Sequence, residues 1–166
     1  GIDQIPSFII KRCISAIVQP LVYLVNMSFA EGKFPNTLII NKIKPVFKKG
    51  DVHVMDNYRP IALSSAFSKI FEYCYLERLT HFLHTHKILI DNQFGFRSGC
   101  NTSDAIHEFI DSIVKYIESG QFPLGIFCDL SKAFDCVSHE ILLIKAEKYG
   151  IRGKSLDWME SFFDLN

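Results

Sequence analysis

The sequence predicts a helix-rich α+β fold in which a few short antiparallel strands accompany longer helices. Apolar residues recur at helical spacing over several long segments, and the stripe between residues 105 and 117 is the clearest of them. Shorter runs at residues 39–47, 61–63 and 125–129 are apolar or alternate in character, and turn-forming residues bound them, which is typical of strands. At 166 residues the chain can bury a core, as one domain or as part of a larger one.

Two helices are predicted before the first strand. The first begins after Pro6 and ends at Pro20, because proline lacks the amide hydrogen that a helix interior needs. The second runs from Leu21 to Gly32, where glycine favours a helix end. The strand at residues 39–47 then alternates between an apolar face and an unusually basic one.

Four helices are predicted after the short strand at residues 61–63, at residues 64–86, 102–119, 138–149 and 155–163. Ser64 or Ser65 is the expected N-cap of the first of these helices, and Thr102 or Ser103 that of the second. The second is strongly amphipathic and should end at Gly120, so its apolar stripe is expected to pack against another part of the protein.

Charge is unevenly distributed along a chain whose formal net charge is +0. Residues 1–59 carry eight Lys or Arg against four Asp or Glu, a net charge of +4, and residues 60–166 balance it. The neutral total excludes a global basic field that would hold nucleic acid by charge alone. A basic first part and an acidic remainder suit a protein that holds a polyanion in one place and divalent cations in another.

Cysteine usage and hydropathy bound the cellular compartment. The five cysteines are scattered and never spaced Cys-x-x-Cys, which predicts small core residues in a reducing compartment. The most apolar stretch, residues 14–27, is interrupted by Gln19 and Pro20 and is shorter than a bilayer requires. We therefore expect an intracellular protein that is not secreted and has no membrane partner. A hydrophobic content of 48% with fifteen Phe also predicts apolar surface that something else covers.

A cluster of cations accompanies the first predicted strand and the turn after it: Lys42, Lys44, Lys48, Lys49 and Arg59. Lysine binds phosphate as a mobile point charge, and arginine binds it as a planar fork. An edge strand that lysines protect from pairing with another sheet would carry similar residues. Taken by itself, the cluster leaves phosphate binding and edge protection both open.

Residues 93–97 place Gly95 between two phenylalanines in a polar loop. The glycine would let the backbone approach a ligand, and an aromatic ring or Arg97 could stack on a base. A tight turn with two aromatic core anchors explains the same residues equally well. The three histidines at positions 81, 84 and 86 fit an exposed helix end better than a zinc site, since no further ligand lies nearby in the sequence.

The apolar run at residues 125–128 ends in Asp129 and is predicted to be a buried strand. A buried carboxylate is costly without a partner, so a metal ion or another cation is expected beside it. The alternative is that Asp129 is an N-cap for a helix beginning near Ser131. Asp135, which follows across a turn, need not meet Asp129, so the residues alone give one firm metal ligand and no two-metal site.

Eight short motifs follow one another along the chain, at residues 1–6, 32–35, 46–51, 57–61, 68–72, 93–97, 129–135 and 149–153. In order and spacing they resemble the reverse transcriptase domain of non-LTR (LINE-type) retrotransposons, and arthropod elements of the jockey type in particular. The resemblance covers nearly the whole chain, and eight ordered motifs are far more specific than any one of them. It favours the functional interpretation of the basic cluster and of Asp129 over the structural alternatives.

The resemblance implies a right-hand polymerase fold, with residues 1–120 as the fingers, including an N-terminal helical extension, and residues 121–166 as the first part of the palm. The implied activity is that of an RNA-directed DNA polymerase, a nucleotidyltransferase that adds deoxynucleotides to a primer 3′-hydroxyl. Its implied partners are an RNA template, a DNA primer and deoxynucleoside triphosphates, and its implied cofactors are two Mg²⁺ ions. Its implied location is the cytoplasm or nucleus, in a ribonucleoprotein.

By position, the resemblance also implies roles for residues of the second half of the chain. Asp129 matches the first catalytic carboxylate, which binds both metal ions, and the Leu130 carbonyl matches a further metal ligand. Phe134 matches the aromatic steric gate that such polymerases place against the sugar 2′ position. The segment that lines the template corresponds to Gln93, Phe94, Gly95, Phe96 and Arg97.

In the first half, Arg59 and one of two lysines, Lys48 or Lys49, match the fingers residues that grip the incoming triphosphate. The length of the loop leaves the choice of lysine open. Ile39 and Asn41 stand in a stretch where the family usually has a basic residue, so this chain has one cation fewer in its fingers strand.

The family's Phe-Ala-Asp-Asp box, with its two remaining metal carboxylates, is not found after Asp135. We therefore expect these 166 residues to be an N-terminal piece of a longer polypeptide, inactive alone, whose remaining palm and thumb lie elsewhere in the parent. The alternative is a non-catalytic nucleic-acid-binding remnant of a degenerate retroelement.

Overall fold

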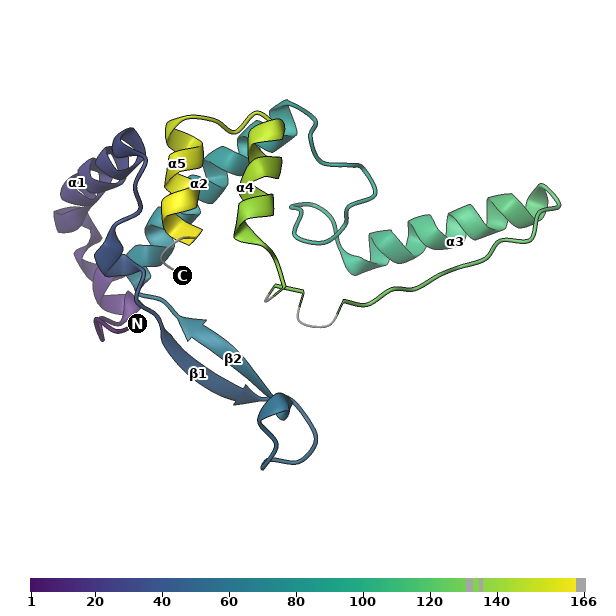
Figure 1. The fold of residues 1–166 in the computed structure, drawn as a ribbon, viewed down its shortest axis with the longest axis horizontal. Helices are drawn as coiled ribbons and strands as arrows, with labels where there is room; N and C mark the ends of the chain where they lie inside the picture. Colours follow the sequence, from purple (N-terminus) through teal and green to yellow (C-terminus); the bar gives the residue numbers. More distant parts are fainter. Residues whose placement is uncertain (131–132, 135, 164–166) are drawn as a thin grey trace. The chain divides into compact units, whose positions relative to one another are not determined.

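The part of the chain that the structure describes is helix-rich with one small antiparallel sheet, which confirms the predicted α+β class (Figure 1). The structure, a computed structural model, describes residues 1–130, 133–134 and 136–163. Its elements in chain order are α1 Ser7–Glu31, β1 Lys42–Phe47, β2 Tyr58–Leu63, α2 Ala66–Thr85, α3 Thr102–Glu118, α4 His139–Lys148 and α5 Lys154–Phe163, with short 3₁₀ turns η1 Asn36–Leu38 and η2 Met55–Asn57.

The chain divides into two compact units. The first contains residues 1–79 and 137–166, and the second contains residues 80–136. These units are defined by contacts within this chain, whereas the boundary expected at residue 120 separates functional regions of a polymerase. That boundary therefore stays a prediction.

Helix α1 is continuous through Pro20, so the predicted break into two helices is wrong. Proline removes one helical hydrogen bond, but the flanking turns on both sides are rich in apolar residues, and Leu21 and Val25 of the later part pack into the core of the first unit. The helix ends where predicted: Gly32 has φ +69°, and its amide hydrogen bonds to carbonyls of the last turn.

Helix α1 is also long and apolar enough, by length and composition alone, to cross a membrane. Only 11% of its most apolar 18-residue window is buried. A core helix of a soluble protein or an N-terminal signal sequence can have the same length and composition, so these properties alone do not identify a membrane span. The expectation of no membrane partner stays a prediction.

The core of the first unit forms where α1, α2 and α5 meet around Trp158. The Trp158 ring stacks on Tyr75 with centroids 4.2 Å apart, and Phe34 meets it edge to face at 5.2 Å. The indole Nε1–H of Trp158 donates a hydrogen bond to Ser28 Oγ at 2.9 Å, which satisfies the one polar group of that ring. Ser161 Oγ accepts the Phe34 amide at 2.8 Å, so the turn after α1 is fixed to α5.

The sheet is a two-stranded hairpin that extends away from the helices of its unit (Figure 1). Strand β1 begins three residues later than predicted, because residues 36–38 form a 3₁₀ turn and Ile39 packs in the core. Pro45 pairs directly with Pro60. Counting from the hydrogen bond between the Lys48 amide and the Asn57 carbonyl, 2.8 Å, this is a non-hydrogen-bonded pair, whose amides would point outward. The two prolines therefore leave the ladder intact and remove an outward donor from each edge.

In the second unit, α3 begins at Thr102, one residue before the first start that a Thr102 cap would give. Asn101, not Thr102 or Ser103, is the N-cap: its side chain accepts the amides of Ser103 and Asp104, and Asp104 accepts the Asn101 amide in return. This reciprocal pair satisfies donors that a helix start leaves free. The apolar stripe of α3 is present as predicted but remains largely exposed.

Residues 121–130 are extended and exposed and form no strand, so the predicted buried strand is wrong. They run back along α3 (Figure 1). Phe127 meets Phe109 of α3 edge to face at 5.2 Å, and a Cβ added at Gly125 would lie 3.0 Å from the Phe109 ring. A strand needs a hydrogen-bonded neighbour, and the only ladder among the described residues joins β1 and β2.

The cysteines are free, as predicted, but none is buried. Cys74 and Cys100 are half-buried, and the other three are exposed: Cys13, Cys128 and Cys136. The prediction of core residues is therefore wrong for the three exposed cysteines, whereas Cys74 packs against the hydrophobic core of the first unit. The exposed three lie on the outer face of α1 or in the segment from residue 121 to α4, where few side chains cover them.

Candidate functional site

The hairpin carries its charged residues on one of its two faces. Residues that pair across the strands point to the same side, and successive residues alternate. One face therefore carries Lys42, Lys44 and Arg59, which pair with Leu63, Ile61 and Val46 respectively. The other face is uncharged, and Phe47 and Tyr58 form an edge-to-face pair on it with centroids 5.5 Å apart.

The alternation distinguishes the two lysines that the sequence left open. Lys48 is the next residue after β1, and its amide bonds to Asn57, so it continues the ladder and lies on the face of Lys44 and Arg59. Lys49 falls in the bend that follows. The geometry thus groups Lys48, and not Lys49, with Arg59.

These cations are exposed and have no carboxylate partner among the residues that the structure describes. Among the described residues, the ion pairs join Arg97 to Asp91 and Lys154 to Asp157, and neither involves the hairpin. A cluster of like charges without counter-charges is repulsive unless an anion approaches it. The basic face can therefore bind a polyanion such as a phosphate chain.

The loop that supports this face depends on two residues to which the sequence assigned no role. The side-chain amide of Asn57 donates to the Asp51 carbonyl at 2.8 Å, and the Tyr58 hydroxyl donates to the Val52 carbonyl at 2.8 Å. Asn57 also lies against Gly50, where a Cβ would come within 2.7 Å of the amide nitrogen. In the sequence, the glycine of the Lys-Lys-Gly-Asp turn was the one indication of this tight loop, because Gly50 adopts φ +93°, which other residues disfavour.

In the second unit, the predicted template segment forms a loop held by its own arginine. Arg97 Nη1 donates to the Ile90 carbonyl at 2.9 Å and to the Asp91 carbonyl at 3.4 Å, and its side chain is only 19% exposed. Gln93 Nε2 donates to the Gly95 carbonyl at 3.3 Å. A cavity of about 610 Å³ lies beside the loop, with His84, Lys87 and Arg97 among its lining residues.

The two phenylalanines of this loop behave differently. Phe94 is half-buried, whereas Phe96 is 97% exposed with φ +57°. The alternative of two core anchors therefore fails for Phe96. Its exposed ring meets Phe134 edge to face, with centroids 5.9 Å apart and planes at 87°. The structure thus brings together one residue of the template segment and the predicted sugar gate.

Asp129, Leu130 and Phe134 are all exposed. Ser131 and Asp135 lie outside the described residues. The alternative in which Asp129 caps a helix beginning near Ser131 also falls on these residues. The basic hairpin and Asp129 belong to different units, so each is described by itself.

The described residues do not make a complete metal site. No group of three or more His, Cys, Asp or Glu side chains gathers among them, and this includes the three histidines near the end of α2. Mg²⁺ prefers six oxygen ligands in octahedral geometry. Asp129 and the Leu130 carbonyl could supply two of these, and the rest would come from water, substrate or residues outside the described set.

The chain is similar to enzymes of mobile elements. The model of the family "Reverse transcriptase (RNA-dependent DNA polymerase)" matches residues 46–166. The "Probable RNA-directed DNA polymerase from transposon BS" and the "RNA-directed DNA polymerase from mobile element jockey", both of Drosophila melanogaster, are each 30% identical over 149 residues, which is 89% of this chain. The jockey enzyme of Drosophila funebris is 30% identical over 133 residues, 78% of the chain. The chain spans 16%, 16% and 14% of these relatives' lengths.

Proposed function

The chain belongs to the reverse transcriptase (RNA-dependent DNA polymerase) family, and from that membership we propose that it forms the fingers and the first part of the palm of a non-LTR retrotransposon polymerase. Residues 1–120 are assigned to the fingers and residues 121–166 to the palm. The polymerase copies an RNA template by extending a DNA primer with deoxynucleoside triphosphates. It acts inside the cell, in a ribonucleoprotein.

The basic face of the hairpin carries this proposal. Lys48 and Arg59 lie on one side of an exposed ribbon without carboxylate partners among the described residues. A triphosphate is a compact polyanion that a lysine and an arginine bind well together, because one supplies a point charge and the other a fork of donors. We therefore assign triphosphate binding to Lys48 and Arg59 and give Lys49 no direct part.

The remaining roles follow the family pattern residue by residue. Asp129 and the Leu130 carbonyl contribute metal ligands, and Phe134 contacts the sugar 2′ position. Reverse transcriptases depend on a divalent metal, and Mg²⁺ is the ion we propose. Because the described residues supply so few ligands, the complete site requires carboxylates from beyond them.

Primer extension tests the proposal in the polypeptide encoded by the complete reading frame that contains these residues. A labelled DNA primer on an RNA template should be extended, and Asp129→Asn should abolish extension. Asp111→Asn, which changes an exposed carboxylate of α3, is the matched control and should leave extension unchanged. Extension that survives Asp129→Asn would refute the assignment of the catalytic carboxylate.

The second candidate is a nucleic-acid-binding remnant without catalysis, because the exposed basic face of the hairpin can bind RNA phosphates without any metal site. It predicts salt-dependent binding of RNA by the basic face together with no extension by the complete polypeptide. The same primer-extension experiment therefore separates the two functions.

A further inference from the structure

Phe96 has a backbone conformation that its side chain disfavours. A phenylalanine at φ +57° lies in the left-handed region, where steric contacts of Cβ make all residues except glycine uncommon. Its ring is 97% exposed, so burial of the side chain does not compensate for the strain. Backbone strain of this kind persists only where the surrounding structure imposes it, and it tends to occur at functional sites.

Arg97 closes the loop that contains Phe96. Its guanidinium reaches back to the carbonyls of Ile90 and Asp91 at 2.9 and 3.4 Å, which closes residues 90–97 into a compact loop. The side-chain amide of Gln93 holds the Gly95 carbonyl inside that loop. With both ends fixed, Phe96 is directed outward at the edge of the loop. The Arg97 side chain is 19% exposed, and its Nη1 donates to both carbonyls, so it holds the two ends of the loop together.

The outward ring of Phe96 is placed against Phe134. The two centroids lie 5.9 Å apart with the ring planes nearly perpendicular, which is the favoured edge-to-face arrangement. Phe134 is itself 78% exposed. An exposed aromatic side chain without a neighbour samples several rotamers. The Phe96 ring removes part of that freedom.

We propose that Phe96 is a positioning residue for the sugar gate: Arg97 holds Phe96 in a strained conformation, and the edge-to-face contact fixes the Phe134 ring. This inference rests on the proposed function, because it gives Phe134 the role of checking the sugar 2′ position. A gate ring that changes rotamer rejects a 2′-hydroxyl less well. Loss of the Phe96 ring should therefore lower the preference for deoxynucleotides more than it lowers their use.

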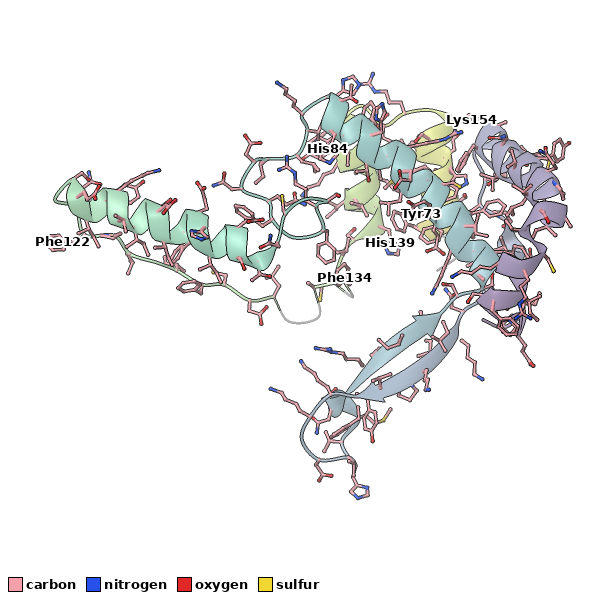
Figure 2. The ribbon with its side chains drawn as sticks, turned by 180° about the vertical axis from the view of Figure 1, so that it is seen from behind. Tyr73, His84, Phe122, Phe134, His139 and Lys154 are labelled. Atoms are coloured by element: carbon pink, nitrogen blue, oxygen red, sulfur yellow. The ribbon has the colours of Figure 1, made fainter. Side chains whose placement is uncertain are left out.

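The contact can be tested without any enzymatic activity. With 4-fluorophenylalanine at position 134, Phe96→Leu should shift the fluorine NMR resonance, because the ring current of Phe96 is lost. Phe122→Leu is the matched control: Phe122 is fully exposed and lies at the other end of the segment that leads to Phe134 (Figure 2). A second fluorine probe at Phe127, which packs on Phe109, should keep its resonance and so report that the unit remains folded. An unchanged resonance at position 134 would overturn the contact.

The role is tested by the ratio of kcat/KM for a deoxynucleotide to that for the matching ribonucleotide, in the complete polypeptide. Phe96→Leu should lower this ratio about two- to tenfold, the factor that an edge-to-face ring contact is worth, while kcat/KM for the deoxynucleotide changes less. Phe96→Tyr keeps the ring and should restore the ratio. Arg97→Ala should lower it as Phe96→Leu does.

The outcomes of these experiments distinguish failure of the proposed polymerase function from failure of the positioning role of Phe96. If the wild-type polypeptide extends no primer, the proposed function falls, and the sugar role of Phe96 falls with it. If extension occurs and the ratio is unchanged in Phe96→Leu, the positioning role is refuted while the proposed function stands. A lowered ratio that Phe96→Tyr restores supports both.

Discussion

The basic face of the hairpin makes a quantitative prediction about RNA binding. Replacing Lys48 and Arg59 by alanine removes two exposed cations that have no ion-pair partner among the described residues. For single strands, log K falls with log salt with a slope of about −0.7 for each phosphate contact. Losing two contacts should therefore make the slope of the double variant less negative by about 1.4. If the electrostatic contribution vanishes near 1 M salt, that slope corresponds to roughly 25-fold weaker binding at 0.1 M.

Fluorescence anisotropy of a labelled single-stranded RNA, titrated at several salt concentrations, measures the slope. The matched control replaces Lys145 and Lys148, two exposed lysines of α4 in the same unit, and should leave the slope nearly unchanged. Lys49→Ala should also have little effect if Lys48 is the residue grouped with Arg59. Equal loss in the hairpin and α4 variants would refute a local site and indicate binding by net charge alone.

Three further predictions concern catalysis and stability. The 166-residue polypeptide alone should not extend a primer on an RNA template, because it supplies Asp129 without the family's second carboxylate box; Mg²⁺-dependent extension that Asp129→Ala abolishes would contradict this. Trp158→Ala should lower the free energy of unfolding by about 3–5 kcal/mol in chemical denaturation, since it empties the centre of the core and removes the hydrogen bond from the indole to Ser28 Oγ. Burial raises the pKa of the Tyr75 hydroxyl above its ordinary value of 10.0, and the hydrogen bond with Ser155 opposes this rise. The neutral hydroxyl therefore stabilises the fold fully below pH 10, and this stabilisation is lost as the pH rises through the raised pKa. Above pH 10 the free energy of unfolding of Tyr75→Phe, measured by chemical denaturation, should fall less steeply with pH than that of the wild-type protein.

The sequence predicted elements well where their determinants are local. Ser65 caps α2 by accepting the Ser68 amide at 2.9 Å, and Gly32 ends α1 in the left-handed conformation, both as their residue types indicate. The family resemblance likewise depended on short local motifs and is confirmed. Pro20 failed as a helix end because packing of the turns around it outweighs one lost hydrogen bond.

The candidate site was predictable residue by residue but not as a set of contacts. Position in the motifs identified Phe134 and Phe96 separately, and nothing in their spacing along the chain indicated that the rings would meet. The family resemblance implied that Arg97 lines the template, and that role stays a prediction; the structure adds that Arg97 Nη1 closes its own loop. Side-chain partners separated by several residues depend on loop geometry, which residue types alone do not specify.

The segment at residues 121–130 shows what an alternating or apolar run does and does not predict. Its residue types favour extended backbone, and Figure 1 shows this segment stretched out along α3. Burial and strand formation require in addition a neighbouring strand to complete the ladder, and only β1 and β2 pair among the described residues. Phe127 instead finds partial cover on Phe109 of α3, while Phe122 remains fully exposed. The pattern therefore predicted conformation correctly and environment wrongly, because conformation is encoded by the segment itself and environment by its partners.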